Sequence, residues 1–248
     1  MVSELNRFEL TYKPYGNHAI LIEWPSKIDK NILNDILLFK EKIVYHNSKV
    51  IVDIINTYNS ITIIYDLTIR NIYNEISRLK SIYSEELSGE KESSYRWQIP
   101  VCYDLKFGID LEEISAQKKL SIEEILKLHS ERIYTVYFIG FLPGFLYLGG
   151  LDERLHIPRK ATPRFTVEKG SVAIGGSQTG VYPVESAGGW QIMGKSPVSF
   201  FDILLETPCF AKPGDEIVFT PVDMEEYLSI EEQVVEKSYK LNKSIVND

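Results

Sequence analysis

Glycine is concentrated in residues 140–190, a stretch that holds ten of the chain's fifteen glycines. There it alternates with prolines and with short apolar runs such as SVAIGG and GVYPV. Glycine permits backbone angles that other residues avoid and proline fixes φ, so each such cluster favours a tight turn. Short apolar runs separated by turns continue to Thr220. This pattern predicts a β-barrel or β-sandwich for the C-terminal part of the chain.

The N-terminal part has a different pattern, in which β-branched runs alternate with helical periodicity. The predicted elements are two strands in residues 7–24, a helix in 29–44, a hairpin in 50–66 and a helix in 67–83. Asp29 and Thr68 stand where helix N-caps are expected. Two strands, a helix, a hairpin and a helix predict a compact α+β domain.

A polar segment rich in serine and glutamate follows this domain and has no apolar residues to anchor it. We therefore expect a linker at residues 88–94. The predicted domains are then an N-terminal α/β domain at 1–87 and a β-barrel domain at 95–248.

Two short helices are predicted near the start of the second domain. In each, a capping residue is followed three positions later by a glutamate: Asp110 with Glu113, and Ser121 with Glu124. This spacing is typical of a capping box, in which the two residues bond each other's backbone N–H groups.

The charge balance argues against several classes of protein. The net charge is −8 and the isoelectric point is about 5.2, with no basic stripe for a nucleic-acid partner. The chain shows neither a signal-peptide pattern nor an apolar run long enough to cross a membrane. Cys102 and Cys209 lack metal-ligand spacing and read as buried apolar residues. We expect an acidic, soluble, cytoplasmic protein.

Two arginines lie on a segment that proline keeps extended. Arg159 and Arg164 each follow a proline directly, in the sequence IPRKATPR. Proline disfavours a helical residue before it, so this segment is expected to form an extended strap that displays cationic groups. Arginine can bind a carboxylate through two parallel hydrogen bonds.

A glycine-rich polar loop, IGGSQTG, follows the strap. Its backbone N–H groups can approach an anion closely, and the side-chain amide of Gln178 can form hydrogen bonds with an amide group of a ligand. Combined with aromatic walls, these groups predict a pocket for a small molecule with a carboxylate or an amide. The candidate binding residues are Phe145, Arg159, Arg164, Gly175, Gly176, Gln178, Thr179 and Trp190.

The same residues have a structural interpretation. Glycines and prolines turn the corners of many β-barrels, and both arginines can pair with some of the 35 acidic residues. The residues alone leave both interpretations open.

Other chemistries find weaker support. The loop lacks the Gly-Lys-Ser/Thr ending of a P-loop, and Ser177 is not in a G-x-S-x-G motif. The four histidines are scattered, without the spacing of metal ligands. No catalytic residue is therefore assigned from the sequence, and no metal site is expected.

Residues 134–197 resemble the signature of the 5-oxoprolinase B-subunit family. The resemblance lies in YTVYFIGFLPGF, IPRKATPRF, VAIGGSQTG and AGGWQIMGKSP, and YGNHAILIEW fits the family's opening strand. The family is also called allophanate hydrolase subunit 1 and includes the kinase inhibitor KipI. Ala187 and Lys195 depart from it, since a proline and an arginine often stand there.

The resemblance implies an α+β fold, with a small ferredoxin-like N-terminal domain followed by a cyclophilin-like β-barrel domain. It also implies a subunit of an ATP-dependent 5-oxoprolinase, which opens 5-oxoproline to L-glutamate together with subunits A and C. ATP is then expected on a partner subunit or at an interface. The substrate carries one carboxylate and one lactam amide, which is the ligand type inferred above.

Three alternatives remain at this stage. A KipI-like inhibitor would dock on a histidine kinase through an apolar patch around Phe141, Leu142, Phe145 and Tyr147. A subunit of a urea- or allophanate-processing amidohydrolase is suggested by the older family name. Prolyl isomerase activity is suggested by the implied fold alone, and fold does not carry function.

Overall fold

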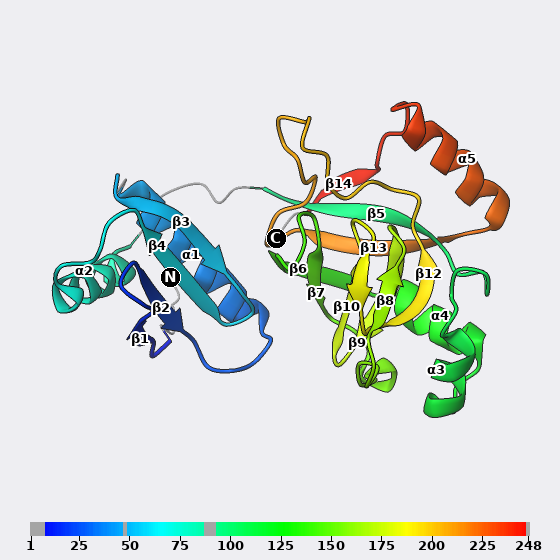
Figure 1. The fold of residues 1–248 in the computed structure, drawn as a ribbon, viewed down its shortest axis with the longest axis horizontal. Helices are drawn as coiled ribbons and strands as arrows, with labels where there is room; N and C mark the ends of the chain where they lie inside the picture. Colours follow the sequence, from blue (N-terminus) through cyan, green and yellow to red (C-terminus); the bar gives the residue numbers. More distant parts are fainter. Residues whose placement is uncertain (1–7, 47–48, 87–92, 247–248) are drawn as a thin grey trace, which may run out of the picture. The chain divides into compact units, whose positions relative to one another are not determined.

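The computed structural model describes residues 8–46, 49–86 and 93–246, in two compact units, Met1–Glu92 and Ser93–Asp248 (Figure 1). Each unit has its own hydrophobic core. Every helix within the described residues is too short or too polar to span a bilayer. Residues 88–92 of the predicted linker lie outside the described residues, and Ser94 already begins a strand. The predicted boundaries at 87 and 95 stay a prediction.

The N-terminal unit is a four-stranded antiparallel sheet with strand order β1-β2-β4-β3, packed against two helices (Figure 1). Its elements are β1 (Thr11–Pro14), β2 (Ala19–Glu23), α1 (Lys30–Tyr45), β3 (Ile51–Asn56), β4 (Ser60–Tyr65) and α2 (Ile72–Ser84). Alternation along β4 buries Ile61 and Ile63 against Ile36 and Phe39 of α1. In a ferredoxin-like sheet with the same strand order, the edge strand beside β2 comes from the segment that follows the second helix. In this protein β1, the first strand of the chain, occupies that edge.

Of the two helix N-caps predicted for this unit, one is confirmed and one is wrong. The Asp29 carboxylate accepts a hydrogen bond from the Asn31 N–H at 2.8 Å, as the N-cap prediction requires. The Thr68 prediction is wrong, because α2 begins later, behind Asn71, whose side chain accepts from the Asn74 N–H. The Thr68 hydroxyl lies instead 3.2 Å from Nε2 of His18.

The C-terminal unit is built on a closed barrel of seven strands in the order β12-β9-β10-β7-β6-β13-β5 (Figure 1). These strands are β5 (Ser94–Cys102), β6 (Ile133–Ile139), β7 (Leu146–Gly149), β9 (Ser171–Gly175), β10 (Gln178–Val181), β12 (Gln191–Lys195) and β13 (Glu216–Val222). The pair Lys195 and Cys102 closes the ring between β12 and β5. Pairing around the ring is antiparallel except between β5 and β13. The predicted fold class is confirmed.

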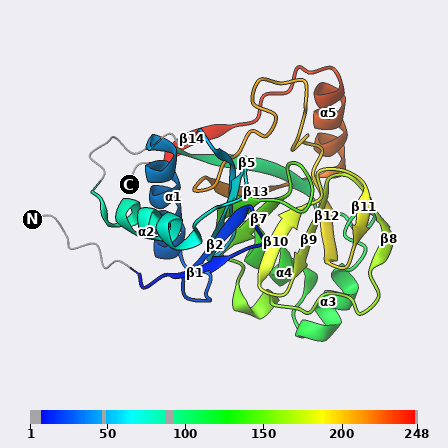
Figure 2. The same ribbon diagram turned by 60° about the vertical axis from the view of Figure 1, so that its left-hand side comes forward.

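The remaining elements surround the barrel. They are α3 (Leu111–Lys118), α4 (Ile122–Ser130), a 3₁₀ turn (Glu153–Leu155), β8 (Arg164–Val167), β11 (Ser186–Gly188), α5 (Met224–Val235) and β14 (Lys243–Val246). Strand β14 pairs with the first part of β5. Strands β8 and β11 form a separate two-stranded ribbon, which Figure 2 shows beside β12.

The barrel core contains a polar cluster centred on the fully buried His129 of α4. Its Nδ1 lies 2.7 Å from the Tyr103 hydroxyl and its Nε2 lies 2.8 Å from the Thr179 hydroxyl. The ring stacks on Phe219 at a centroid distance of 4.7 Å. Burial lowers the pKa of His129 to about 3, so the imidazole is neutral at physiological pH.

The two predicted capping boxes have different outcomes. Around α4 the box is present, since the Ser121 N–H donates to Glu124 and the Glu124 N–H donates to the Ser121 hydroxyl. At α3 the prediction is wrong, because the Asp110 side chain makes no capping hydrogen bond. Its carboxylate is engaged by groups far away in the sequence, which belong to the pocket described next.

Candidate binding pocket

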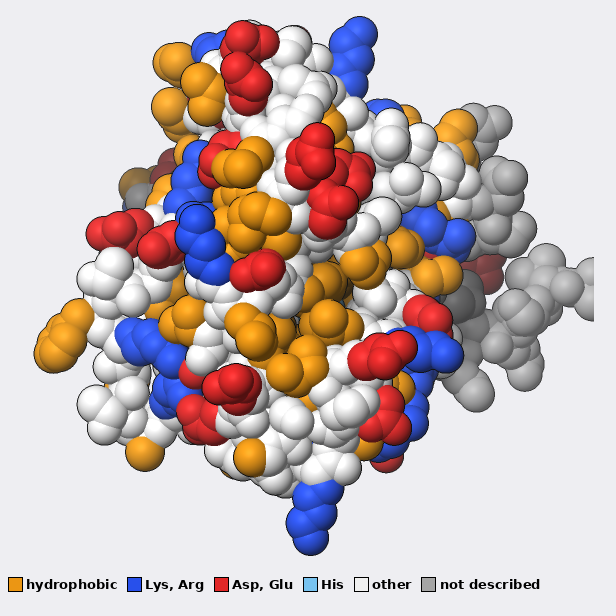
Figure 3. Space-filling model, turned by 90° about the vertical axis from the view of Figure 1, so that its right-hand side faces the viewer, with side chains coloured by type: hydrophobic (Ala, Val, Ile, Leu, Met, Phe, Trp, Pro, Cys, Tyr) orange, Lys and Arg blue, Asp and Glu red, His pale blue; other side chains and the backbone are white. Residues whose placement is uncertain are grey.

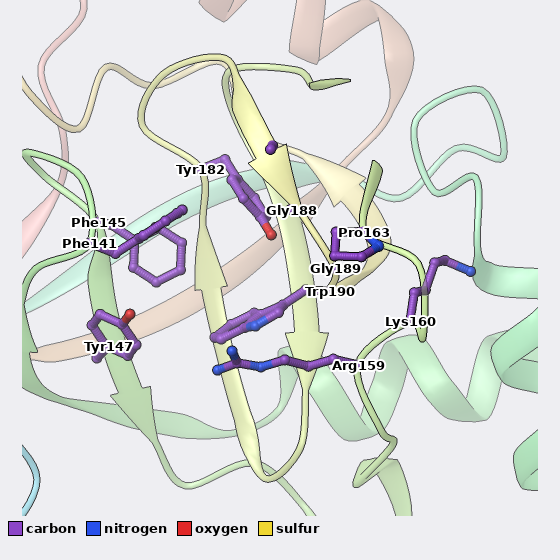
Figure 4. A pocket seen from close by; sticks show the side chains of 11 residues that line it. Phe141, Phe145, Tyr147, Arg159, Lys160, Pro163, Tyr182, Gly188, Gly189 and Trp190 are labelled. Carbon is purple, nitrogen blue, oxygen red and sulfur yellow. The ribbon is translucent and has the colours of Figure 1, made fainter. Parts of the chain in front are cut away.

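A pocket of about 290 Å³ opens beside strands β7 and β12, where aromatic side chains from several elements converge (Figure 4). Its lining residues are Phe141, Phe145, Tyr147, Arg159, Lys160, Pro163, Tyr182, Ala187, Gly188, Gly189 and Trp190. The sequence predicted three of them, Phe145, Arg159 and Trp190, as binding residues. The structure therefore brings these three together at one cavity.

The aromatic wall is held by edge-to-face contacts around Phe145. The centroid of its ring lies 5.6 Å from those of both Tyr182 and Trp190, with the rings nearly perpendicular. Tyr147 lies 5.0 Å away on the other side. All but Tyr147 are buried, so their rings are fixed by packing. Burial raises the pKa of Tyr147 and of Tyr182, so both phenols stay protonated at neutral pH.

Two glycines provide the space for this wall. A Cβ on Gly188 would lie 2.3 Å from the Tyr182 hydroxyl, and one on Gly175 would lie 2.8 Å from the Trp190 ring. Glycine is therefore needed here for close approach to aromatic rings.

Arg159 brings a positive charge to the pocket. Its guanidinium lies 5.5 Å from the centroid of the Trp190 ring, and Figure 4 shows the side chain running along the indole toward Tyr147. The geometry is that of a cation–π contact. Arg159 is exposed, so its donors are accessible to a ligand. The next residue fixes the strap, because the Lys160 N–H donates to the Gly189 carbonyl at 2.6 Å.

Arg164 is placed differently from Arg159. Its Nη2 donates to Oδ1 of Asp110 at 2.5 Å, and its Nη1 donates to the Trp190 carbonyl at 3.4 Å. Arg164 is not among the lining residues. The structure thus places this arginine in an ion pair with an acidic residue, where it supports the backbone behind the indole.

Asp110 is the centre of that support and is 2% exposed. Its Oδ2 accepts a hydrogen bond from the Ile192 N–H at 2.6 Å, while its Oδ1 faces both Arg164 and Lys160. Glu113 of α3 also accepts from Lys160, at 2.8 Å. Burial of the Lys160 ammonium opposes its charge, but the hydrogen bonds to Glu113 and Asp110 outweigh this and raise its pKa.

The other predicted residues lie outside the lining of the pocket. Gly176, at φ +64°, donates its N–H to the Ile157 carbonyl. The Thr179 hydroxyl is buried between His129 and the Ala173 carbonyl. Gln178 stands opposite Gly175 in the β9–β10 hairpin. Their proposed contacts with a ligand stay a prediction.

Several lining residues were not predicted as binding residues. Gly188 and Gly189 precede Trp190, and the Gly-Gly-Trp sequence was the signal that could have found them, whereas Tyr182 has no such local signal. Lys160 belongs to the predicted strap and directly follows Arg159. Within the described parts of the chain, no three His, Cys, Asp or Glu side chains are grouped so as to hold a metal ion.

The family model for the carboxyltransferase domain, subdomain C and D, matches residues 10–211. The 5-oxoprolinase B-subunit of Escherichia coli O157:H7 is 43% identical over 171 residues, 69% of this chain and 78% of that protein. The corresponding 5-oxoprolinase B-subunit of Bacillus subtilis (strain 168) is 32% identical over 228 residues, 88% of this chain and 95% of that protein.

Two solved structures share the fold. The crystal structure of TTHA0988 superposes with a TM-score of 0.71 at 31% identity, covering 83% of this chain and 40% of that longer chain. The K. lactis urea amidolyase has a TM-score of 0.83 at 21% identity, over 98% of this chain and 16% of that chain. At 21% identity the latter shows the fold alone. The family model and the two relatives show that the chain belongs to the 5-oxoprolinase B-subunit family.

Proposed function

We propose that this chain is a subunit of an ATP-dependent 5-oxoprolinase, in which its pocket holds 5-oxoproline or an intermediate derived from it. The observation that carries the proposal is the pair formed by Arg159 and Trp190 at the pocket wall. A cation beside aromatic surfaces matches a small ring that bears one carboxylate. The names of the relatives point to the same substrate.

Each group at the pocket has a role in this proposal. Arg159 binds the carboxylate of the substrate through its guanidinium. The rings of Phe145 and Trp190 pack on the apolar edge of the lactam and keep water from it. The Tyr182 phenol, protonated at neutral pH, is a donor at the same wall. Arg164 and Asp110 keep the wall in place.

An unstrained lactam resists hydrolysis, and ATP supplies the activation that ring opening requires. The pocket does not fit a triphosphate. A triphosphate is held in proteins by several backbone N–H groups and a lysine, whereas here Lys160 is already paired with two acids. We therefore assign ATP to a partner subunit or to an interface with one.

Partner subunits A and C are part of the proposal, and an exposed loop supports an assembly. Ile203, Leu204 and Leu205 are consecutive and are 73%, 81% and 58% exposed. The loop is shaped by a hydrogen bond from the Asp202 N–H to the Pro208 carbonyl. A run of exposed apolar side chains on a shaped loop is expected where another chain covers it.

Figure 3 shows hydrophobic side chains gathered across the middle of another face of the barrel unit, between acidic and basic ones. Exposed apolar residues on the β5–α3 loop and on α5 include Leu105, Ile109 and Leu228. The rings of Phe107 and Tyr227, 4.7 Å apart, connect these two elements. This face also fits a subunit contact.

The test is the ATP-dependent release of L-glutamate from 5-oxoproline. It is measured for this chain alone and for the chain co-expressed with subunits A and C, with ATP omitted as the control. Activity in the mixture and none for the single chain is the expected result. No activity in any combination, with every chain folded, contradicts the proposal.

The rim of the pocket favours a second candidate, a KipI-like module that binds a histidine kinase. Phe141 is 62% exposed and holds a positive φ of 65°, which is unusual for a bulky residue. An exposed aromatic group at a pocket rim suits a protein segment as well as a small ligand. Inhibition of kinase autophosphorylation by the purified chain would support this candidate. Turnover of urea or allophanate by the assembled complex would instead support an amidohydrolase acting on those substrates.

A further inference from the structure

The two neighbouring cations of the strap point in opposite directions. Figure 4 shows the Arg159 side chain running along the Trp190 ring into the pocket, whereas the Lys160 side chain extends away from the aromatic residues. The Lys160 ammonium faces α3, where two carboxylates receive it. The adjacent arginine and lysine therefore do not present two charges to the same ligand.

Lys160 is held in this orientation from both ends. Its Nζ lies 2.8 Å from Oε2 of Glu113 and 3.1 Å from Oδ1 of Asp110. Its backbone N–H donates to the Gly189 carbonyl. The side chain is 18% exposed, so the ammonium is largely shielded from solvent counter-ions. A ligand that needed this ammonium would have to break two ion pairs.

The cluster behind the pocket is electrically neutral. Two acids, Asp110 and Glu113, face two cations, Lys160 and Arg164. Within residues 8–46, 49–86 and 93–246, no carboxylate pairs with the guanidinium of Arg159. The pocket thus presents one uncompensated positive charge.

We propose that Glu113, together with Asp110, is a specificity-determining residue that restricts the pocket to ligands with a single negative charge. This inference rests on the proposed function of the pocket as a carboxylate site. A second carboxylate on the ligand would find Lys160 already paired within a neutral cluster, so it would gain no net attraction to offset its loss of hydration.

Glu113 is the residue to change, because its side chain is 48% exposed and that of Asp110 is 3% exposed. Glu113→Gln keeps an oxygen that can accept from Lys160, and it removes one negative charge. Glu112→Gln is the matched control, since Glu112 is exposed on the same helix and does not pair with Lys160. The two variants have the same net charge.

The experiment measures the binding of benzoate and isophthalate to the full chain by calorimetry. Both probes are flat rings, and the second differs by one added carboxylate. In Glu113→Gln we expect the affinity ratio of isophthalate to benzoate to rise roughly two- to fivefold. In Glu112→Gln the ratio should stay within the error of the wild-type value.

Two outcomes overturn the inference, and they are distinguishable. If the wild-type chain binds benzoate, Arg159→Gln abolishes that binding, and Glu113→Gln leaves the ratio unchanged, the charge selection by Glu113 is wrong and the carboxylate site stands. If neither probe binds the wild-type chain, or binding is indifferent to Arg159→Gln, the pocket is not a carboxylate site. Both the inference and the proposed site then fail.

Discussion

Gly175 leaves the space that the indole of Trp190 fills, because a Cβ on residue 175 would lie 2.8 Å from two atoms of that ring. Gly175→Ala should displace the indole and close part of the pocket, at a cost of about 1–3 kcal/mol in the free energy of unfolding. Urea unfolding and the emission of Trp190 check this. Gly176→Ala is the control, since no atom lies within 4 Å of a Cβ there and the positive φ alone causes strain. Unchanged Trp190 emission in Gly175→Ala would contradict the packing argument.

The two arginines of the strap should respond differently to truncation. Arg164→Ala leaves the buried Asp110 carboxylate short of a partner and should lower the free energy of unfolding by about 2–3 kcal/mol. Arg159→Ala removes an exposed side chain and should change it by less than about 0.5 kcal/mol. Urea titrations of both variants decide the matter. Equal losses would show that the ion pair is not what distinguishes them.

The buried imidazole should make stability depend on pH. His129 has a pKa of about 3 in the folded chain, against 6.5 as its ordinary value. The unfolded chain therefore binds a proton between these values that the folded chain does not, and stability falls as pH falls through that window. At pH 5 the loss relative to neutral pH is about 2 kcal/mol.

His129→Gln should remove this component, whereas His18→Gln, at an exposed position, should not. Unfolding in urea at pH 5 and pH 7 measures the difference. In a direct check, the nuclear magnetic resonance signals of the His129 ring should not titrate down to pH 5. A midpoint near the ordinary histidine value of 6.5 would contradict the buried, neutral state.

The exposed loop should matter for assembly and not for folding. Leu204→Ser changes a side chain that is 81% exposed and should leave the free energy of unfolding within about 0.5 kcal/mol. It should weaken association with the partner subunits, as measured by co-purification and analytical ultracentrifugation. Leu67→Ser, on an N-terminal residue that is 67% exposed, is the control. If both variants assemble like the wild type, the loop is not a subunit contact.

The sequence predicted those features that depend on neighbours in the chain. Alternation and turn residues indicated the N-terminal sheet and the barrel strands, and the Ser121 box is present. Phe145 and Arg159 were predicted from the turn and the proline directly before them, and Trp190 was predicted as an aromatic wall of the pocket. Each of these signals acts over a few residues.

The features that the sequence did not predict depend on contacts between distant residues. Asp110 has the spacing of a helix cap, but Arg164, 54 residues later, takes its carboxylate. Tyr182 directly follows the short strand β10, and the neighbouring sequence does not indicate on which face of the barrel its side chain packs. The barrel closure that brings α3, the strap and β12 together decides these contacts, and a linear pattern does not record that closure.

The central claim is that Arg159 binds the substrate carboxylate, and steady-state kinetics of the assembled complex test it most directly. Arg159→Gln should raise the KM for 5-oxoproline by roughly ten- to a hundredfold, the loss of a charge-assisted hydrogen bond of about 1.5–3 kcal/mol. Arg70→Gln, at an exposed arginine of the N-terminal unit, should leave the KM unchanged. An unchanged KM in the Arg159 variant, with the complex intact and active, would contradict the assignment of this pocket.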